Sequence, residues 1–147
     1  METSFNNYRI NDQFLQTDLK FVHAELSNSY WAKNIPFETV KKGAENSLCF
    51  NVFSGNEQIA FARVITDKTS FAYLCDVIVT ESFRGKGIGK ALMAFIMKHP
   101  DLQGLRRFTL GTKDAHGLYA QFGFTTPKFP ERQMEINVRD IYQKKKE

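Results

Sequence analysis

The chain contains little cysteine, proline or histidine. Its 147 residues include two cysteines, four prolines and three histidines. Cys49 and Cys75 both lie within apolar runs, and the residues around them have no metal-ligand spacing. A secreted disulfide scaffold or a structural zinc site would need more cysteines in a recognisable pattern. We therefore expect two buried thiols in a reducing compartment, with no disulfide and no metal site.

The sequence also lacks a long apolar run. No stretch approaches the roughly 20 apolar residues that a transmembrane helix needs. The polar start, METSFNNYRI, lacks the charged and apolar segments of a secretory signal. We therefore predict a cytoplasmic protein that binds no membrane. Because 42% of the residues are hydrophobic, the chain can form one core, and we predict a single domain over residues 1–147 that ends in a basic tail, residues 139–147.

A strong charge of either sign is absent as well. The formal net charge is +4, and much of the excess lies in the final QKKKE and in a glycine-rich stretch, ESFRGKGIGKAL. This moderate charge is compatible with a small anionic ligand and indicates nucleic acid only weakly. We expect no nucleic-acid partner, since no stacking or groove-reading motif is present. The alternative, a nucleic-acid binder, would use Arg84, Lys86, Lys90, Arg106, Arg107 and Lys144 to Lys146.

Apolar periodicity divides the chain into alternating elements. Asp18 is placed to cap a first helix, and a second helix would begin at Pro36. Two further helices are predicted over 90–99 and 114–122. The predicted strands are 5–10, a hairpin over 48–67, 69–79, 106–112 and 134–138.

The order of these elements predicts the fold class. Three consecutive strands over residues 48–79 form an antiparallel meander. The strand, helix and strand that follow imply a parallel pair joined by a right-handed crossover. We therefore predict an α/β fold in which a mixed sheet, first antiparallel and then parallel, is flanked by helices.

Three glycines alternate with other residues at the end of the third meander strand. A nucleotide-hydrolase phosphate loop would need glycine where Arg84 stands and Ser or Thr where Ala91 stands. A dinucleotide-binding fingerprint needs a different glycine spacing and a second strand, helix and strand unit. What remains is a tight turn and a helix N-terminus surrounded by cations, which is an anion site suited to a pyrophosphate.

Two motifs resemble those of the GNAT superfamily of N-acetyltransferases. Residues 84–89, RGKGIG, match the family's Gln/Arg-x-x-Gly-x-Gly/Ala signature, and residues 119–124, YAQFGF, resemble its Tyr-x-x-x-Gly-Phe motif. The resemblance extends over nearly the whole chain in element order and is tightest between residues 71 and 124. It implies a GNAT-like fold that uses acetyl-CoA as co-substrate, without a metal.

The resemblance also implies where the coenzyme binds. The strand before the glycines would splay from its neighbour and hold the pantetheine arm by its backbone. Many family members have Asn where this chain has Thr112, so the polar contact there differs. Ala115, a small residue on the face of Tyr119, leaves room for the arm. The implied coenzyme-binding residues are Val77, Ile78, Val79, Arg84, Gly85, Lys86, Gly87, Ile88, Gly89, Lys90, Thr112 and Ala115.

Two residues are predicted to be catalytic. The resemblance places the phenol of Tyr119 beside the coenzyme sulfur, where it would protonate the leaving thiolate. Asp76, an acid inside an apolar strand, is a candidate base for the attacking amine. Alternatively, Asp76 has a structural role and pairs with a cation such as Arg63. Water and His116 are other routes for the proton.

The sequence defines the acceptor less closely than it defines the coenzyme. Tyr30 and Trp31 would form an aromatic wall of its pocket, or would instead anchor the N-terminal helices to the sheet. We predict transfer of an acetyl group to a primary amine of a small molecule or peptide, by direct attack in a ternary complex. The alternative is a non-catalytic acyl-CoA-binding module of the same fold. A homodimer formed through the late strand is compatible with the sequence.

Overall fold

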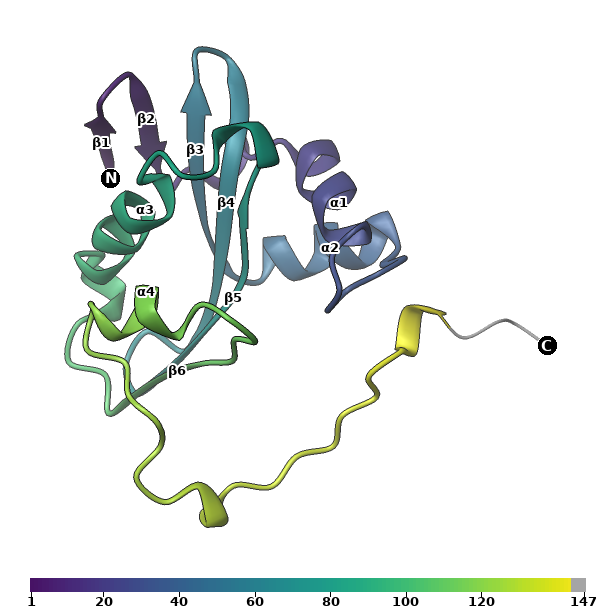
Figure 1. Cartoon of the computed structure of the whole chain (residues 1–147), viewed down its shortest axis with the longest axis vertical. Coiled ribbons are helices and arrows are strands. Elements are labelled where there is room, and N and C mark those ends of the chain that lie inside the picture. The colour runs from purple at the N-terminus through teal and green to yellow at the C-terminus, as the bar shows by residue number, and fades with distance from the viewer. Residues whose placement is uncertain (144–147) are drawn as a thin grey trace.

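The computed structural model describes residues 1–143, and it forms one mixed sheet with helices on both faces (Figure 1). The strands are β1 (Glu2–Phe5), β2 (Tyr8–Asn11), β3 (Leu48–Ser54), β4 (Glu57–Thr66), β5 (Phe71–Val79) and β6 (Arg107–Leu110). The α-helices are α1 (Leu19–Ser27), α2 (Phe37–Glu45), α3 (Ile88–Met97) and α4 (His116–Ala120).

The six strands lie in the sheet in the order in which they occur in the chain. Strands β1 to β5 pair antiparallel, whereas β5 and β6 pair parallel. The parallel pair needs the crossover through α3, because a short turn can join only antiparallel strands. The predicted mixed α/β architecture, antiparallel and then parallel, is confirmed.

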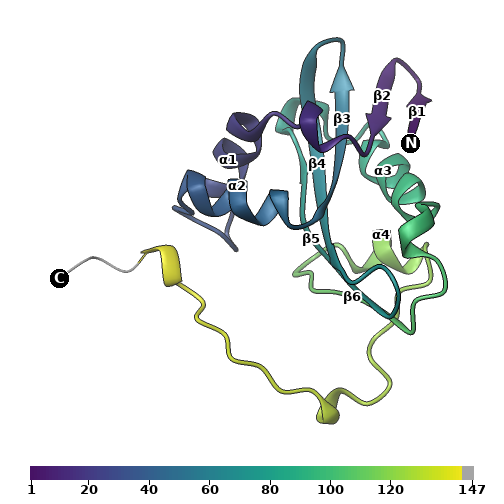
Figure 2. The same ribbon diagram turned by 180° about the vertical axis from the view of Figure 1, so that it is seen from behind.

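Helices α1 and α2 cover one face of the sheet, and α3 and α4 lie on the other (Figures 1 and 2). Each face therefore has its own apolar cluster. The cluster under α1 and α2 consists of Val22, Leu26, Ala32, Val40, Ala44, Cys49, Phe61 and Ile78. The larger cluster, under α3 and α4, includes Phe50, Val52, Ile59, Val64, Leu74, Leu92, Met93, Ile96 and Tyr119.

Local sequence explains where the helices begin. The Asp18 carboxylate accepts a hydrogen bond from the Phe21 amide at 3.2 Å, so Asp18 caps α1 as predicted. Helix α2 begins immediately after Pro36, which has no N–H to leave unpaired. The cap and the proline thus account for the N-termini of the helical pair.

Two strand predictions are wrong. Residues 5–10 do not form one strand, because a turn at Asn6 and Asn7 divides the region into the β1–β2 hairpin. Asn6 has φ of 54°, a left-handed conformation that asparagine tolerates better than most residues. Residues 134–138 form no strand, because they leave the body of the protein and have no backbone to pair with. The predicted tail falls partly outside the described residues, including all of Lys144 to Lys146.

Within residues 1–143, no helix has both the length and the apolar character needed to cross a membrane.

Candidate functional site

The β5 and β6 strands diverge after a short parallel ladder. Their pairing joins Phe71–Leu74 to Arg107–Leu110 and then stops, although β5 continues to Val79. The β6-facing edge of residues 75–79 therefore has no ladder partner among the described residues. A strand edge of this kind presents N–H and C=O groups to an extended ligand. Val77, Ile78 and Val79, the predicted pantetheine contacts, lie on this segment.

A β-bulge lies at the start of the open edge. The β4–β5 register shifts between Phe61 and Arg63, which pair with Ile78 and Cys75. Asp76 lies in the bulge with φ of 53°, although it is not glycine. Such strained positions persist only where surrounding contacts hold them, and they gather at functional sites.

Two side chains hold the Asp76 carboxylate. The Arg63 guanidinium donates from Nε to Oδ2 at 2.8 Å, and the Trp31 indole donates from Nε1 to Oδ1 at 3.1 Å. The Asp76 side chain is only 12% exposed. Burial alone would lower the pKa of Arg63, but the adjacent carboxylate outweighs this and raises it. The contact with Arg63 is the one that the structural alternative for Asp76 predicted.

The glycine turn connects the end of β5 to α3. Gly85 and Gly87 have φ of 78° and 81°, conformations that side chains other than glycine rarely adopt. Gly87 is the N-cap residue of α3, and no side chain caps the helix. The first amide groups of α3 are therefore free of side-chain partners, which suits them to an anion. A Cβ atom on Gly87 would lie 3.3 Å from Cζ of Phe5.

The cations of the glycine turn are all at the surface. Arg84 donates from Nε to the Val79 carbonyl at 3.0 Å, so its position is coupled to the end of β5. The Lys86 ammonium lies 6.0 Å from the centre of the Phe83 ring. Ile88 is buried and anchors the start of α3 in the core, whereas Lys90 is exposed. The turn therefore combines a left-handed glycine backbone with exposed positive charge.

Tyr119 projects from the short helix α4 into the apolar cluster of the α3 face. It is 8% exposed, and its ring packs edge-on against Phe124 with centroids 6.2 Å apart. Burial, followed by the nearby Tyr30 and Asp114, raises the pKa of the phenol. The phenol is therefore a neutral hydrogen-bond donor at ordinary pH.

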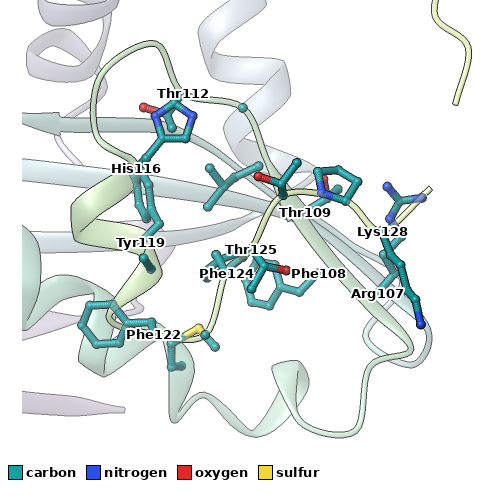
Figure 3. Close-up of a pocket in the computed structure, with 17 residues that line it drawn as sticks. Arg107, Phe108, Thr109, Thr112, His116, Tyr119, Phe122, Phe124, Thr125 and Lys128 are labelled. Atoms are coloured by element: carbon teal, nitrogen blue, oxygen red, sulfur yellow. The ribbon is translucent and has the colours of Figure 1, made fainter. Parts of the chain in front are cut away.

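A pocket of about 760 Å³ lies beside α4 (Figure 3). Residues 107–112 of the β6 region form one wall, and residues 122–128 form another. Thr112, His116 and Tyr119 lie at one end of the pocket, and Arg107 and Lys128 lie at the other (Figure 3). Thr112 Oγ1 accepts a hydrogen bond from the Ala115 amide at 3.0 Å, and Ala115 is the N-cap residue of α4. Thr112 thus orients the turn that carries Tyr119.

Tyr30 and Trp31 lie on the loop after α1, at the opposite side of the sheet from α3. Their ring centroids lie 5.0 Å apart in an edge-on arrangement; Tyr30 is 63% exposed and Trp31 43%. The Lys113 ammonium lies 5.3 Å from the centre of the Tyr30 ring. This contact joins the N-terminal loop to the loop before α4, although the two are far apart in the sequence.

The structure adds residues that the sequence analysis missed. Lys113 lies over the ring of Tyr30, and Asp114 is near enough to Tyr119 to help raise the pKa of its phenol. Only their position next to the YAQFGF helix could have indicated them. Among residues 1–143, no group of three or more His, Cys, Asp or Glu side chains is placed to hold a metal ion.

Comparison with known proteins places these features in a family. A model of the acetyltransferase (GNAT) family matches residues 13–124 of the chain. This range includes the open edge of β5, the glycine turn and α4.

Solved structures of other proteins share the fold. A GNAT-family protein from Xanthomonas campestris pv. campestris is 48% identical, with a TM-score of 0.92 over 93% of this chain and 97% of its own. A GNAT-family acetyltransferase from Elizabethkingia anophelis, with acetyl-CoA bound, is 16% identical, with a TM-score of 0.64 over 89% of this chain and 88% of its own. A Clostridium acetobutylicum protein, solved with acetyl-CoA, is 15% identical, with a TM-score of 0.63 over 90% of this chain and 96% of its own.

Proposed function

The chain belongs to the acetyltransferase (GNAT) family, and from this we propose that it transfers the acetyl group of acetyl-CoA to a primary amine of a small molecule or peptide. The observation that carries the proposal is the continuity between the open edge of β5 and the uncapped N-terminus of α3. An extended ligand with an anionic end fits this arrangement. The two relatives of the same fold that were solved with acetyl-CoA support the choice of coenzyme.

The backbone of the site would bind the coenzyme. We assign the pantetheine arm to the edge of Val77, Ile78 and Val79, and the pyrophosphate to the turn at residues 84–90. The positive φ of Gly85 and Gly87 lets the amides of the turn face a phosphate without an intervening Cβ atom. Acetyl-CoA supplies the activated acyl group, and a backbone N–H of the open edge would polarise its carbonyl.

Tyr119 would supply the proton for the leaving thiolate. Its raised pKa keeps the phenol protonated at neutral pH, as a general acid must be. The pocket beside it gives solvent or a ligand access to a side chain that is otherwise buried. The acceptor amine would attack the thioester directly in a ternary complex.

Asp76 is better suited to positioning than to proton transfer. Both of its oxygens already accept hydrogen bonds, from Arg63 and from Trp31. We propose that this carboxylate holds the bulge and the Trp31 indole at the edge of the acceptor region. The amine proton would then leave through water or another group, and His116, which lines the pocket, is a candidate.

A coenzyme-release assay tests the proposal. Purified protein is given acetyl-CoA and a panel of polyamines, amino acids, aminoglycosides and short peptides, and free thiol is measured. We expect release above the rate of acetyl-CoA hydrolysis with at least one class of amine. Calorimetric titration with acetyl-CoA is run in parallel. Binding without release for any amine would identify a non-catalytic acyl-CoA module, and no binding at all would refute the coenzyme site.

A further inference from the structure

Tyr30 and Trp31 are exposed aromatic side chains on a loop that is fixed by other groups. The Ser29 hydroxyl accepts a hydrogen bond from the Ala32 amide at 3.1 Å and donates to the Leu26 carbonyl at 2.6 Å. Ala32 is buried and belongs to the apolar cluster under α1 and α2. The loop is therefore held by its backbone and by Ala32, and the two rings are not required to bury it.

A buried ion pair orients the Trp31 indole. The indole donates from Nε1 to Oδ1 of Asp76 at 3.1 Å, while the other oxygen of the same carboxylate accepts from Arg63. A ring that served only to anchor the loop would be buried against the sheet, as large aromatic side chains in cores are. Trp31 is instead fixed by its polar edge and leaves 43% of its surface accessible.

Tyr30 extends this aromatic surface toward the proposed reaction centre. Tyr30 follows α1, whereas Tyr119 lies on α4, on the other face of the sheet (Figures 1 and 2). After burial, Tyr30 is the next cause of the raised pKa of the Tyr119 phenol, so the two phenols are near each other. They approach from opposite faces beside the segment where β5 and β6 no longer pair. A ligand on the aromatic surface would therefore reach the acetyl group from the α1 side.

The charged groups at this surface balance each other. The Asp76 carboxylate is matched by the Arg63 guanidinium at 2.8 Å. The Lys113 ammonium lies over the Tyr30 ring, and Asp114 is the next residue in the chain. A polycationic acceptor binds to a surplus of carboxylates, and these two pairs provide no surplus.

Lys113 also disfavours a second cation at Tyr30. An aromatic ring attracts an ammonium group, but the ring of Tyr30 already has the Lys113 ammonium 5.3 Å from its centre. An additional ammonium there would be repelled by Lys113. A neutral amine, which is the form that attacks a thioester, is not repelled. The surface thus favours a single amine on an apolar body.

We propose that the acceptor is a primary amine carried by an aromatic or similarly flat apolar body without a second cation, and that this body packs on Tyr30 and Trp31. The inference rests on the proposed acetyl transfer and names the substrate class of the same site. Aromatic pairs gain free energy beyond the area that they bury. In the reaction the new C–N bond forms as the C–S bond of the thioester breaks. The amine loses one proton to water, and the thiolate gains one from Tyr119, which solvent then reprotonates.

Tryptophan fluorescence tests the binding of this amine class without turnover. The chain contains one tryptophan, so the signal comes from Trp31 alone. Protein in the presence of CoA is titrated with 2-phenylethylamine, propylamine and spermidine. We expect a saturable change with 2-phenylethylamine and at least about 10-fold weaker binding of propylamine, which lacks the ring. Spermidine should give no saturable change in the same concentration range.

Thiol release from acetyl-CoA tests the role of Tyr30 in specificity. We expect Tyr30→Ala to lower kcat/KM for 2-phenylethylamine about 10-fold, mainly through KM, and to leave that for propylamine unchanged. The fold should be intact, because Tyr30 is 63% exposed. A purely structural role of Tyr30 would lower both values alike. The control is Leu15→Ala, which truncates a side chain that is 95% exposed and outside the site, and it should change neither value.

Reversing the charge of Lys113 tests the exclusion of polycations. Lys113→Glu places an anion beside Tyr30, so kcat/KM for spermidine should rise roughly 3- to 5-fold relative to that for 2-phenylethylamine. The control is Lys98→Glu, which makes the same charge change at the exposed end of α3, on the other face of the sheet. It should leave the ratio unchanged.

Three results would overturn the inference. Equal kcat/KM values for 2-phenylethylamine and propylamine would show that the ring is not recognised, and a wild-type preference for spermidine would identify a polycation site. Absence of a fluorescence response to every amine would remove the acceptor from Trp31. The first two results leave acetyl transfer established. A fluorescence response selective for 2-phenylethylamine, without thiol release for any amine, would instead support this binding surface and refute the transfer.

Discussion

The Arg63 guanidinium and the Asp76 carboxylate form a half-buried ion pair across β4 and β5, with Nε and Oδ2 separated by 2.8 Å. Arg63 also donates from Nη1 to Ser47 Oγ at 3.1 Å, so it links the bulge to the start of β3. Arg63 lies on β4 and Asp76 lies at the start of the open edge of β5, so the pair links these two strands. Its position explains how a non-glycine residue is kept at φ of 53°.

Replacing Asp76 by asparagine should test this structural role. Asparagine tolerates the left-handed backbone and keeps the shape, so the change removes mainly the charge. We expect the free energy of unfolding to fall by about 2–4 kcal/mol, because Arg63 would be left without its partner. Urea denaturation gives this value, and kcat should fall less than 10-fold.

The matched control for this change is Asp101→Asn. Asp101 pairs with Lys68 at 3.9 Å, but both side chains are well exposed. Removing such a pair should change stability by less than about 1 kcal/mol. A stable Asp76→Asn protein with kcat reduced by orders of magnitude would instead identify Asp76 as the catalytic base.

Adding a side chain at Gly87 should weaken coenzyme binding. Gly87→Val forces a branched residue into a left-handed conformation and brings Cβ to 3.3 Å from Phe5. It also covers the amides that we assign to the pyrophosphate. We expect calorimetry to show acetyl-CoA affinity reduced by several kcal/mol, against about 1 kcal/mol for Lys86→Ala, which loses one exposed charge.

A second glycine separates backbone strain from ligand contact. Gly55 also has positive φ, 59°, with open space around it, and it lies in the β3–β4 turn. Gly55→Val should therefore destabilise the fold by backbone strain while leaving acetyl-CoA affinity unchanged. Wild-type affinity in a folded Gly87→Val protein would remove the pyrophosphate from this turn.

Tyr119→Phe should reduce turnover while preserving the fold. The phenol ring packs against Phe124, and phenylalanine keeps this contact. We expect kcat to fall roughly 10- to 1000-fold, the range for loss of one general acid, with little change in acetyl-CoA affinity. The comparison variant is Tyr73→Phe, which removes a half-exposed phenol on β5 and should leave kcat unchanged.

The pH dependence of the wild-type enzyme should agree with this role. Because burial raises the pKa of Tyr119, its proton is retained to a higher pH than in a free phenol. The contribution of the phenol to kcat should therefore be constant through neutral pH and decline only above about 10. Unchanged kcat in Tyr119→Phe, with chemistry shown to be rate-limiting, would make water the proton donor.

Asp12 should make the stability of the fold sensitive to acid. Its oxygens contact the amino terminus at 2.7 Å and the His99 ring at 2.9 Å. Burial alone would raise the pKa of Asp12, but these two hydrogen bonds and charges outweigh it and lower the pKa. A carboxylate with a lowered pKa stabilises the fold above its unfolded pKa, near 4, and this stabilisation is lost as pH falls through the folded value.

Urea denaturation at pH 7 and at pH 3 measures the effect of Asp12. We expect Asp12→Asn to lose about 1–2 kcal/mol at pH 7 and to differ less from the wild type at pH 3. Exposed Asp101→Asn should show no such pH-dependent difference. An equal loss at both pH values would mean that the charge of Asp12 is not involved.

Local patterns in the sequence determined much of the fold and the place of the glycine turn. The Asp18 cap, the apolar runs of β3 to β5 and the glycines at 85 and 87 each act over a few residues, so they can be recognised without knowing the fold. The two motifs that resemble the GNAT family also lie in continuous segments. These features predicted the mixed sheet and, to within two residues, the start of α3 after the glycines.

Only the tertiary structure decided which distant residues meet. From the sequence, Asp76 could be either a catalytic base or a partner of Arg63. The strand register and the bulge, which the sequence does not reveal, bring these two side chains together. Lys113 reaches Tyr30 only because the loops after α1 and before α4 converge at the same end of the sheet. The alternation at 134–138 predicted a strand, but whether such a segment becomes one depends on a second backbone to pair with. After the turn that follows Phe129 this segment leads away from β6, and among residues 1–143 it pairs with no strand.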